Sequence, residues 1–197
     1  MIAGIILAAG KSERMGSPKA LLPFEGSTFL GHLYALLKKS PLEPVRVVLG
    51  AHESRIRMQV ELQGGDVVLN PDYEKGMLSS VQAALISLEQ AKPEAAILFP
   101  VDHPNISPAL IDRVIEAYRA GEGEIIIPLK DSRRGHPVLF AASLFDELRS
   151  APLEIGARQV VRNHPDRVYE LPTTEPGVLQ DIDTPQDYRK LRDQIQE

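Results

Sequence analysis

The sequence contains no cysteine among its 197 residues. A chain without thiols forms no disulfides, no thiolate zinc sites and no iron–sulfur clusters, and it offers no Cys nucleophile. The absence of cysteine is also compatible with the reducing cytoplasm, which is the location we expect.

Long apolar runs and long runs of like charge are missing as well. The first apolar stretch, residues 2–9, is too short for a transmembrane helix, which needs about 20 residues. No basic leader precedes it, as a signal peptide would require, so we interpret it as a buried strand. The formal net charge is −5 and no run of like charge exceeds three residues. We therefore expect neither a membrane nor a nucleic acid as a partner.

The chain does contain an alternation of short apolar runs and helix-like segments. Its length corresponds to about one domain, and 43% apolar with 25% charged residues is ordinary for a globular protein. Buried strands are predicted at residues 2–9, 45–49, 66–69, 95–99 and 124–128, and helices at residues 28–39, 53–62, 77–89 and 107–119. This alternation predicts an α/β fold with a mostly parallel sheet, as one domain over residues 1–197.

The C-terminal half departs from this rhythm. Residues 129–142 carry a polar, glycine-bearing turn and then an apolar run, which predicts a hairpin or an antiparallel excursion. Short helices are expected near residues 143–149 and 157–163, and strands near residues 167–171 and 178–182. Thr184 and Asp187 have the spacing of a capping box and predict the start of a terminal helix.

The loop after the first strand, residues 7–19, is the most informative segment. Small residues let its backbone approach a ligand closely, and Lys11, Arg14 and Lys19 face a single Glu13 in an otherwise acidic protein. Free backbone N–H groups with three cations suit a polyphosphate, although a solvated glycine-rich turn is the alternative. The candidate ligand-binding residues here are Leu7, Ala8, Ala9, Gly10, Lys11, Ser12 and Gly16.

Two common nucleotide motifs do not fit this loop. The phosphate loop G-x-x-x-x-G-K-[ST] would need glycine at Ile5, and the neighbouring Gly4 lies inside the strand. The dinucleotide fingerprint G-x-G-x-x-G fails because Ala8 and Ala9 stand where glycines are required.

Carboxylates follow two of the predicted strands. Asp102 comes after residues 95–99, between Pro100 and Pro104, and a carboxylate beside a phosphate loop is a candidate Mg²⁺ ligand. If residues 178–182 end a strand, Asp181 and Asp183 face one side, and Asp183 could join Asp102 around the metal. The alternatives are that Asp102 shapes a turn and that Asp183 caps the last helix.

Two further groups are candidates for ligand contact. Asn70 ends the third predicted strand and Ser80 lies near the start of the next helix, where they could read a base or ribose. Helix capping by Ser79 or Ser80 is the alternative. Gly135, His136 and Pro137 fall in the irregular section, where His136 could contact an acceptor phosphate or be merely structural. The other histidines, His103 among them, show no metal-ligand spacing.

These motifs together resemble the nucleotidyltransferases that act on the molybdenum cofactor. Residues 7–16 (LAAGKSERMG) with Lys19 resemble L-A-A-G-x-S-x-R-M-G…K, and residues 100–104 resemble P-x-D-x-P. Residues 76–80, 135–137 and 181–187 (DIDTPQD) follow in the expected order. The resemblance spans essentially the whole chain and implies a three-layer, Rossmann-like nucleotidyltransferase fold with a mostly parallel, seven-stranded sheet.

The resemblance also implies the reaction. The loop would hold a nucleoside triphosphate, Arg14 and Lys19 would neutralise its phosphates as catalytic residues together with Asp102, and Asp102 and Asp183 would hold Mg²⁺. A substrate phosphate would attack the α-phosphorus and release pyrophosphate. Ala9, in place of the glycine of guanylyltransferases, and the Gly135–Pro137 motif resemble the cytidylyltransferase branch. We therefore expect CTP rather than GTP, with molybdopterin as acceptor.

Other functions remain possible at this point. The chain could be a guanylyltransferase on the same cofactor, a sugar-1-phosphate nucleotidyltransferase, or a nucleotide-binding regulator or cofactor chaperone without catalysis. The resemblance further implies a transient contact with a molybdoenzyme or its chaperone.

Overall fold

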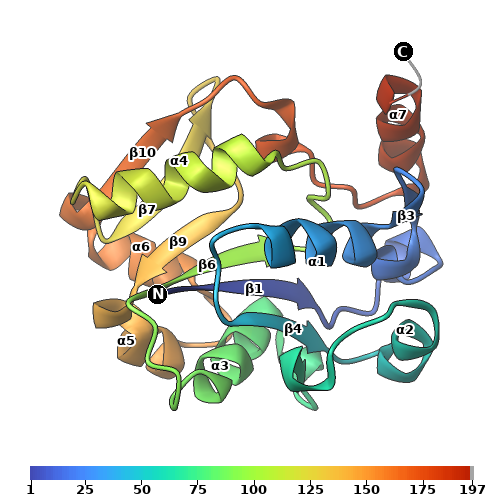
Figure 1. Cartoon of the computed structure of the whole chain (residues 1–197), viewed down its shortest axis with the longest axis horizontal. Coiled ribbons are helices and arrows are strands. Elements are labelled where there is room, and N and C mark those ends of the chain that lie inside the picture. Colours follow the sequence, from blue (N-terminus) through green and yellow to red (C-terminus); the bar gives the residue numbers. More distant parts are fainter. Residues whose placement is uncertain (196–197) are drawn as a thin grey trace.

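The computed structural model describes residues 1–195 and is built around one large mixed sheet (Figure 1). The sheet has eight strands in the order β10-β7-β9-β6-β1-β4-β5, with the short β8 paired to β7. Its strands are β1 (Ile2–Ala8), β4 (Val45–Leu49), β5 (Val67–Leu69), β6 (Ala95–Pro100), β7 (Ile125–Lys130), β8 (Arg133–Arg134), β9 (Val138–Ala141) and β10 (Val168–Pro172). A separate two-stranded ribbon consists of β2 (Pro23–Phe24) and β3 (Ser27–Thr28).

The central strands are buried on both faces, as their continuous apolar runs predict. Every residue of β1 is buried, and β1 pairs in parallel with β4 on one side and β6 on the other. The parallel arrangement brings the carboxyl ends of these three strands to one edge of the sheet.

The antiparallel excursion predicted for residues 129–142 is confirmed. β9 lies between β6 and β7 and runs antiparallel to both, while β10 returns in parallel with β7. The fold class predicted from the sequence is therefore correct, and β8 adds a short eighth strand to the expected seven.

Helices cover both faces of the sheet and make three layers (Figure 1). One core lies under α1 and α4, and α2 and α7 contribute one buried side chain each, Ile56 and Leu191. A second core lies under α3, α5 and α6 on the opposite face.

The α-helices are α1 (Phe29–Lys39), α2 (Glu53–Gln59), α3 (Met77–Ser87), α4 (Pro108–Arg119), α5 (Phe145–Ser150), α6 (Arg158–Asn163) and α7 (Pro185–Ile195). The 3-10 helices are η1 (Glu13–Met15), η2 (Lys19–Leu21), η3 (Gly64–Asp66), η4 (Tyr73–Lys75), η5 (Ala142–Leu144), η6 (Pro165–Arg167) and η7 (Pro176–Leu179). Within residues 1–195, no helix is both long enough and apolar enough to cross a membrane.

Side-chain caps fix several helix starts where the sequence predicts them. Oγ of Ser107 accepts a hydrogen bond from the Leu110 N–H at 3.1 Å, which begins α4. The capping box before α7 is also confirmed, because Oδ2 of Asp187 accepts from the Thr184 N–H at 2.9 Å. At their C-terminal ends, α2 and α3 stop two to three residues before the expected ends.

Residues 178–182 do not form the expected strand. η7 takes up the first part, and the rest is irregular. The backbone here makes isolated hydrogen bonds instead of a strand ladder. The Ile182 N–H, for example, donates to the carbonyl oxygen of Asp102 at 3.0 Å. The apolar pattern correctly indicated burial, since Val178 and Ile182 are buried, but no neighbouring strand is available to extend a ladder.

Candidate active site at the carboxyl edge of the sheet

A pocket of about 490 Å³ opens at the carboxyl ends of β1 and β6. It brings together eleven of the residues singled out in the sequence: Leu7, Ala8, Ala9, Gly10, Lys11, Ser12, Arg14, Lys19, Ser80, Asp102 and Asp183. Five others do not line it, namely Gly16, Asn70, Gly135, His136 and Pro137. The phosphate-loop and carboxylate predictions therefore converge on one cavity.

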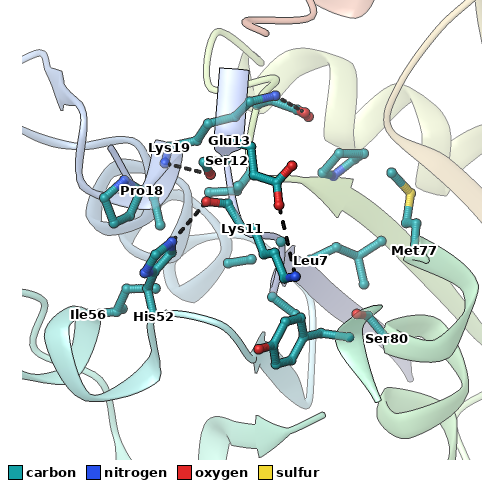
Figure 2. Close-up of a pocket in the computed structure, with 18 of the residues that line it drawn as sticks. Leu7, Lys11, Ser12, Glu13, Pro18, Lys19, His52, Ile56, Met77 and Ser80 are labelled. Carbon is teal, nitrogen blue, oxygen red and sulfur yellow. Dashed lines mark hydrogen bonds and ion pairs between the residues drawn. The ribbon is translucent and has the colours of Figure 1, made fainter. Parts of the chain in front are cut away.

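The loop after β1 is held in shape by its own polar groups. The Lys19 N–H donates to Oγ of Ser12 at 3.0 Å, and Ser12 has a φ of 56°, a left-handed conformation that is uncommon outside glycine. Gly16, with a φ of 73°, supplies a second left-handed turn. Figure 2 shows His52 beside the loop, where its Nε2 lies 2.9 Å from the carbonyl oxygen of Lys11.

This shape leaves backbone donors free in the cavity. The N–H groups of Gly10 and Lys11 make no hydrogen bond to any residue that the structure describes. Unpaired backbone N–H groups in a concave loop bind anions, because each needs an acceptor. The loop therefore has the properties that the sequence predicts for binding a polyphosphate.

The ammonium of Lys19 lies between two carboxylates. Its Nζ is 2.9 Å from Oδ2 of Asp102 and also contacts Oδ1 of Asp183. Arg14 adds a guanidinium 2.6 Å from Oδ2 of Asp183. The two acidic residues, 81 positions apart in the sequence (102 to 183), thus share one cation.

The electrostatics of this cluster keep its groups charged. Burial alone would lower the pKa of Lys19, but the adjacent carboxylates of Asp102 and Asp183 outweigh burial and raise it. Burial likewise opposes ionisation of Asp183, yet Lys19 and Arg14 hold the pKa of that carboxyl below its ordinary value. The Asp183 carboxylate is therefore ionised at neutral pH, and carboxylate oxygens are the ligands that a hard divalent cation such as Mg²⁺ prefers.

The outer rim of the pocket carries an ion pair that the sequence did not indicate. Lys11 Nζ lies 2.5 Å from Oε1 of Glu74, which follows Tyr73 in η4. This contact and its hydrogen bond raise the pKa of Lys11. Pocket-lining residues that sequence reasoning missed include His52, Ile56, Tyr73 and Glu74. They come from the start of α2 and from η4, both distant in the chain from the loop, so no local motif could have revealed them.

Asn70 lies behind the pocket wall and supports it. Its side chain is 3% exposed, and its Nδ2 donates to Oγ of Ser79 at 2.8 Å and to Oγ of Ser80 at 3.0 Å. The alternative that Ser79 or Ser80 caps α3 is excluded, because the capping residue is Gly76 and Ser79 Oγ instead donates to the Gly76 carbonyl. Asn70 thus orients Ser80, which does reach the cavity.

A second cluster lies on the other side of Asp102. Asp102, His103 and Asp181 each place a ligand atom within 4.8 Å of the others, and the ring of His136 lies 4.8 Å from that of His103. The sequence assigned no metal-ligand spacing to His103, because Asp181 and His136 are distant from it in the chain and only Asp102 is adjacent. Because residues 178–182 are not a strand, Asp181 and Asp183 have different partners instead of sharing one side.

A further hollow at the amino ends of β1 and β4 is structural. Its one buried carboxylate, Asp66, accepts from the hydroxyl of Tyr34 at 2.7 Å and pairs with Lys38 at 3.1 Å and Arg46 at 3.7 Å. Its charge is already balanced, and it lies opposite the edge where parallel sheets bind ligands.

A loop with free backbone N–H groups that faces paired carboxylates at this edge of a mostly parallel sheet is the arrangement expected of a nucleotide-dependent transferase. Residues 4–168 match the family described as the MobA-like NTP transferase domain. The chain belongs to this family, so the nucleotidyltransferase class predicted from the sequence is confirmed.

Individual relatives match nearly the full length. The chain is 29% identical to the nicotine blue oxidoreductase of Paenarthrobacter nicotinovorans, over 96% of each chain. It is 28% identical to the molybdenum cofactor cytidylyltransferase of Escherichia coli strain K12, over 98% of this chain and 96% of that protein.

A solved structure agrees with this assignment. Rv0371c of Mycobacterium tuberculosis is 31% identical over 96% of each chain, with a TM-score of 0.81. The same protein in complex with manganese is aligned at 28% identity, with a TM-score of 0.74 over 96% of this chain and 97% of that one.

Proposed function

We propose that this protein transfers a CMP moiety from CTP to the phosphate of molybdopterin and releases pyrophosphate, with Mg²⁺ as cofactor. The observation that carries the proposal is the position of Lys19, whose Nζ lies against Asp102 and Asp183 beside free backbone donors of the loop. A nucleoside triphosphate and a divalent cation match these charges, because phosphates satisfy the loop and the cation satisfies the carboxylates.

Each residue has a defined part in this mechanism. The free N–H groups of Gly10 and Lys11 orient the triphosphate, and Arg14 and Lys19 balance the charge that develops on the departing pyrophosphate. Asp102 and Asp183 would hold Mg²⁺, which when bound supplies positive charge near the reacting phosphorus. An oxygen of the acceptor phosphate attacks the α-phosphorus, and the bond to the bridging oxygen of the pyrophosphate breaks with its electron pair.

We propose molybdopterin as acceptor and cytosine as base from the similarity to a relative and from the residues that line the pocket. The relative named molybdenum cofactor cytidylyltransferase supports molybdopterin as acceptor. Ala8, Ala9 and Ser80 line the pocket where a small base would lie. The manganese complex of Rv0371c supports a divalent cation in this fold. We further propose that residues 1–197 work as one NTP transferase domain in the cytoplasm and pass the product to a molybdoenzyme or its chaperone by transient contact.

The decisive experiment supplies one nucleoside triphosphate at a time. Purified protein is incubated with Mg²⁺, molybdopterin and CTP, GTP or ATP, and both pyrophosphate and the dinucleotide product are measured. Formation of the cytosine dinucleotide with CTP favoured supports the proposal. Predominant guanine dinucleotide makes the chain a guanylyltransferase.

The same assay separates the remaining alternatives. Pyrophosphate release with a sugar 1-phosphate in place of molybdopterin indicates a sugar nucleotidyltransferase. Nucleotide binding without pyrophosphate release indicates a regulator or cofactor chaperone. Consumption of nicotine blue, the substrate in the name of one relative, without any nucleotide transfer indicates an oxidoreductase.

A further inference from the structure

Asp102, His103 and Asp181 form a cluster of which the nucleotidyl transfer described above uses only Asp102. One ligand atom from each lies within 4.8 Å of the other two. His103 is buried, Asp102 is partly buried and Asp181 is exposed, so the cluster runs from the interior to the surface. It adjoins the pocket through Asp102, which lines it.

The hydrogen bonding of His103 prepares its ring to act as a ligand. Nδ1 lies 3.3 Å from the carbonyl oxygen of Gly177, and because a carbonyl only accepts, Nδ1 carries the proton. In the neutral form of this ring, the lone pair is therefore on Nε2. Histidines that ligate metals commonly donate their other N–H to a backbone carbonyl in this way.

His136 adds a second imidazole with an unsatisfied atom. Its ring centroid is 4.8 Å from that of His103, and its Nδ1 is buried without a hydrogen-bond partner among the described residues. Burial lowers the pKa of His136 to about 4, with His103 contributing and Asp102 opposing. The ring is thus neutral at physiological pH, and a buried unpaired nitrogen of this kind needs an explanation.

The charge balance of the cluster calls for a cation. Lys19 and Arg14 are both bound to the Asp102–Asp183 pair. Asp181 makes no ion pair with any residue that the structure describes. The three carboxyl groups of Asp102, Asp181 and Asp183 outnumber these two cations, and such a site favours a divalent cation over an anion.

We propose that Asp102, His103, His136 and Asp181 form a binding site for a divalent transition-metal ion of the zinc class, separate from the Asp102–Asp183 pair. Mixed imidazole and carboxylate ligands are typical of zinc, whereas Mg²⁺ prefers oxygen ligands alone. Ligand atoms around a tetrahedral zinc ion lie about 3.4 Å apart. The ligand atoms of Asp102, His103 and Asp181, which lie within 4.8 Å of one another, would therefore move closer together on binding. Asp102 is shared, since Lys19 contacts its Oδ2 and leaves Oδ1 for this site.

The test uses metal alone, without nucleotide or acceptor, so its result is independent of the proposed transferase activity. Chelator-treated full-length protein is titrated with Co²⁺, whose visible absorption reports imidazole ligation. The expected result is about one bound equivalent per chain. His103→Gln, His136→Gln and Asp181→Asn should each weaken binding by at least about tenfold. Zn²⁺ titration followed by ¹⁵N spectra of the imidazoles should shift the signals of His103 and His136.

Two control variants make the assignment specific. His164→Gln removes an imidazole that contacts Glu147 far from the cluster, and it should leave Co²⁺ binding unchanged. Asp183→Asn removes a ligand of the proposed magnesium pair only, and it should keep the imidazole signal. Asp181→Asn is the most informative ligand variant, because an exposed, isosteric change should not disturb folding, which circular dichroism verifies.

Two outcomes overturn the proposal. The first is that wild-type protein binds no Co²⁺ or binds it without imidazole ligation. The second is that binding survives Asp181→Asn and both histidine variants but is lost in Asp183→Asn, which would place the metal at the Asp102–Asp183 pair alone.

Discussion

The Nζ of Lys19 lies 2.9 Å from Oδ2 of Asp102, a residue 83 positions further along the chain. Lys19 comes from the loop after β1 and Asp102 from the loop after the neighbouring parallel strand β6. The ion pair therefore joins the loop that we propose as the phosphate site to the carboxylate that we propose as a metal ligand. Replacement of either residue tests a different part of the mechanism.

Asp102→Ala should abolish turnover while leaving the fold intact. Removing a carboxylate from a Mg²⁺ site should cost at least about 10²-fold in rate, because that charge acts on the transition state. Pyrophosphate release at saturating Mg²⁺ measures the loss, and circular dichroism verifies folding. Near-wild-type turnover would end the assignment of Asp102 as a metal ligand.

Lys19→Ala should lower kcat more than it raises the KM for CTP. The Lys19 side chain is 11% exposed between two carboxylates, whereas Arg14 is 70% exposed. Screening by water weakens the exposed cation, so Arg14→Ala should have the smaller effect. Steady-state kinetics measure both, with the exposed Lys39→Ala on α1 as a matched control. A rise in KM at constant kcat would show that these cations only bind the ground state.

Ala9→Gly should relax the preference for CTP over GTP. A base that does not fit leaves buried polar groups without hydrogen-bond partners, and each unpaired group costs about 1–3 kcal/mol. Two unpaired groups therefore give about 10²-fold discrimination between CTP and GTP in the wild type. The substitution moves the loop toward the guanylyltransferase pattern, so the preference for CTP over GTP should become weaker without being lost. Competition between both triphosphates measures the ratio of dinucleotides. An unchanged ratio would remove Ala9 from base selection.

Gly177→Ala should destabilise the protein by about 2 kcal/mol or more, because the new Cβ would overlap the backbone carbonyl of Asn105. Gly64→Ala is the matched control, since nothing lies within 4 Å of its Cβ, and its effect should stay within about 0.5 kcal/mol. Denaturant unfolding measures both. Equal stability of the two variants would mean that residues 176–183 move to accommodate the new Cβ without loss of folding free energy.

Folding stability should fall between pH 6.5 and about pH 4 because of His136. The unfolded chain binds a proton near pH 6.5, whereas the folded protein holds the pKa of His136 at about 4, chiefly through burial and also through His103 and Arg158, with Asp102 opposing. The unfolded state therefore binds more protons in this window, and the free energy of unfolding drops by up to about 3 kcal/mol as pH falls.

Urea unfolding in the presence of a chelator measures this dependence. His136→Gln should reduce the fall in the free energy of unfolding between pH 6.5 and about pH 4 by the part that His136 contributes. His32, whose pKa is also lowered by burial, accounts for part of the remaining slope. A variant with an unchanged profile would show that His136 is not buried as a neutral ring in solution.

The sequence by itself determined the α/β class, the strands that are buried on both faces and the helix starts. These features depend on local periodicity and capping, as with Ser107 before α4 and Thr184 before α7. It also predicted that the loop at residues 7–19 and Asp102 lie at one edge of the sheet, because the carboxyl ends of parallel strands necessarily meet there.

Only the tertiary structure decided how the distant segments combine. Residues 178–182 have the apolar pattern of a strand, yet no neighbouring strand pairs with them, so Asp181 and Asp183 have different partners. The approach of His136 to His103 arises because two loops from different parts of the chain pack together. Contacts of this kind depend on how whole elements pack, and no spacing within a single sequence encodes them.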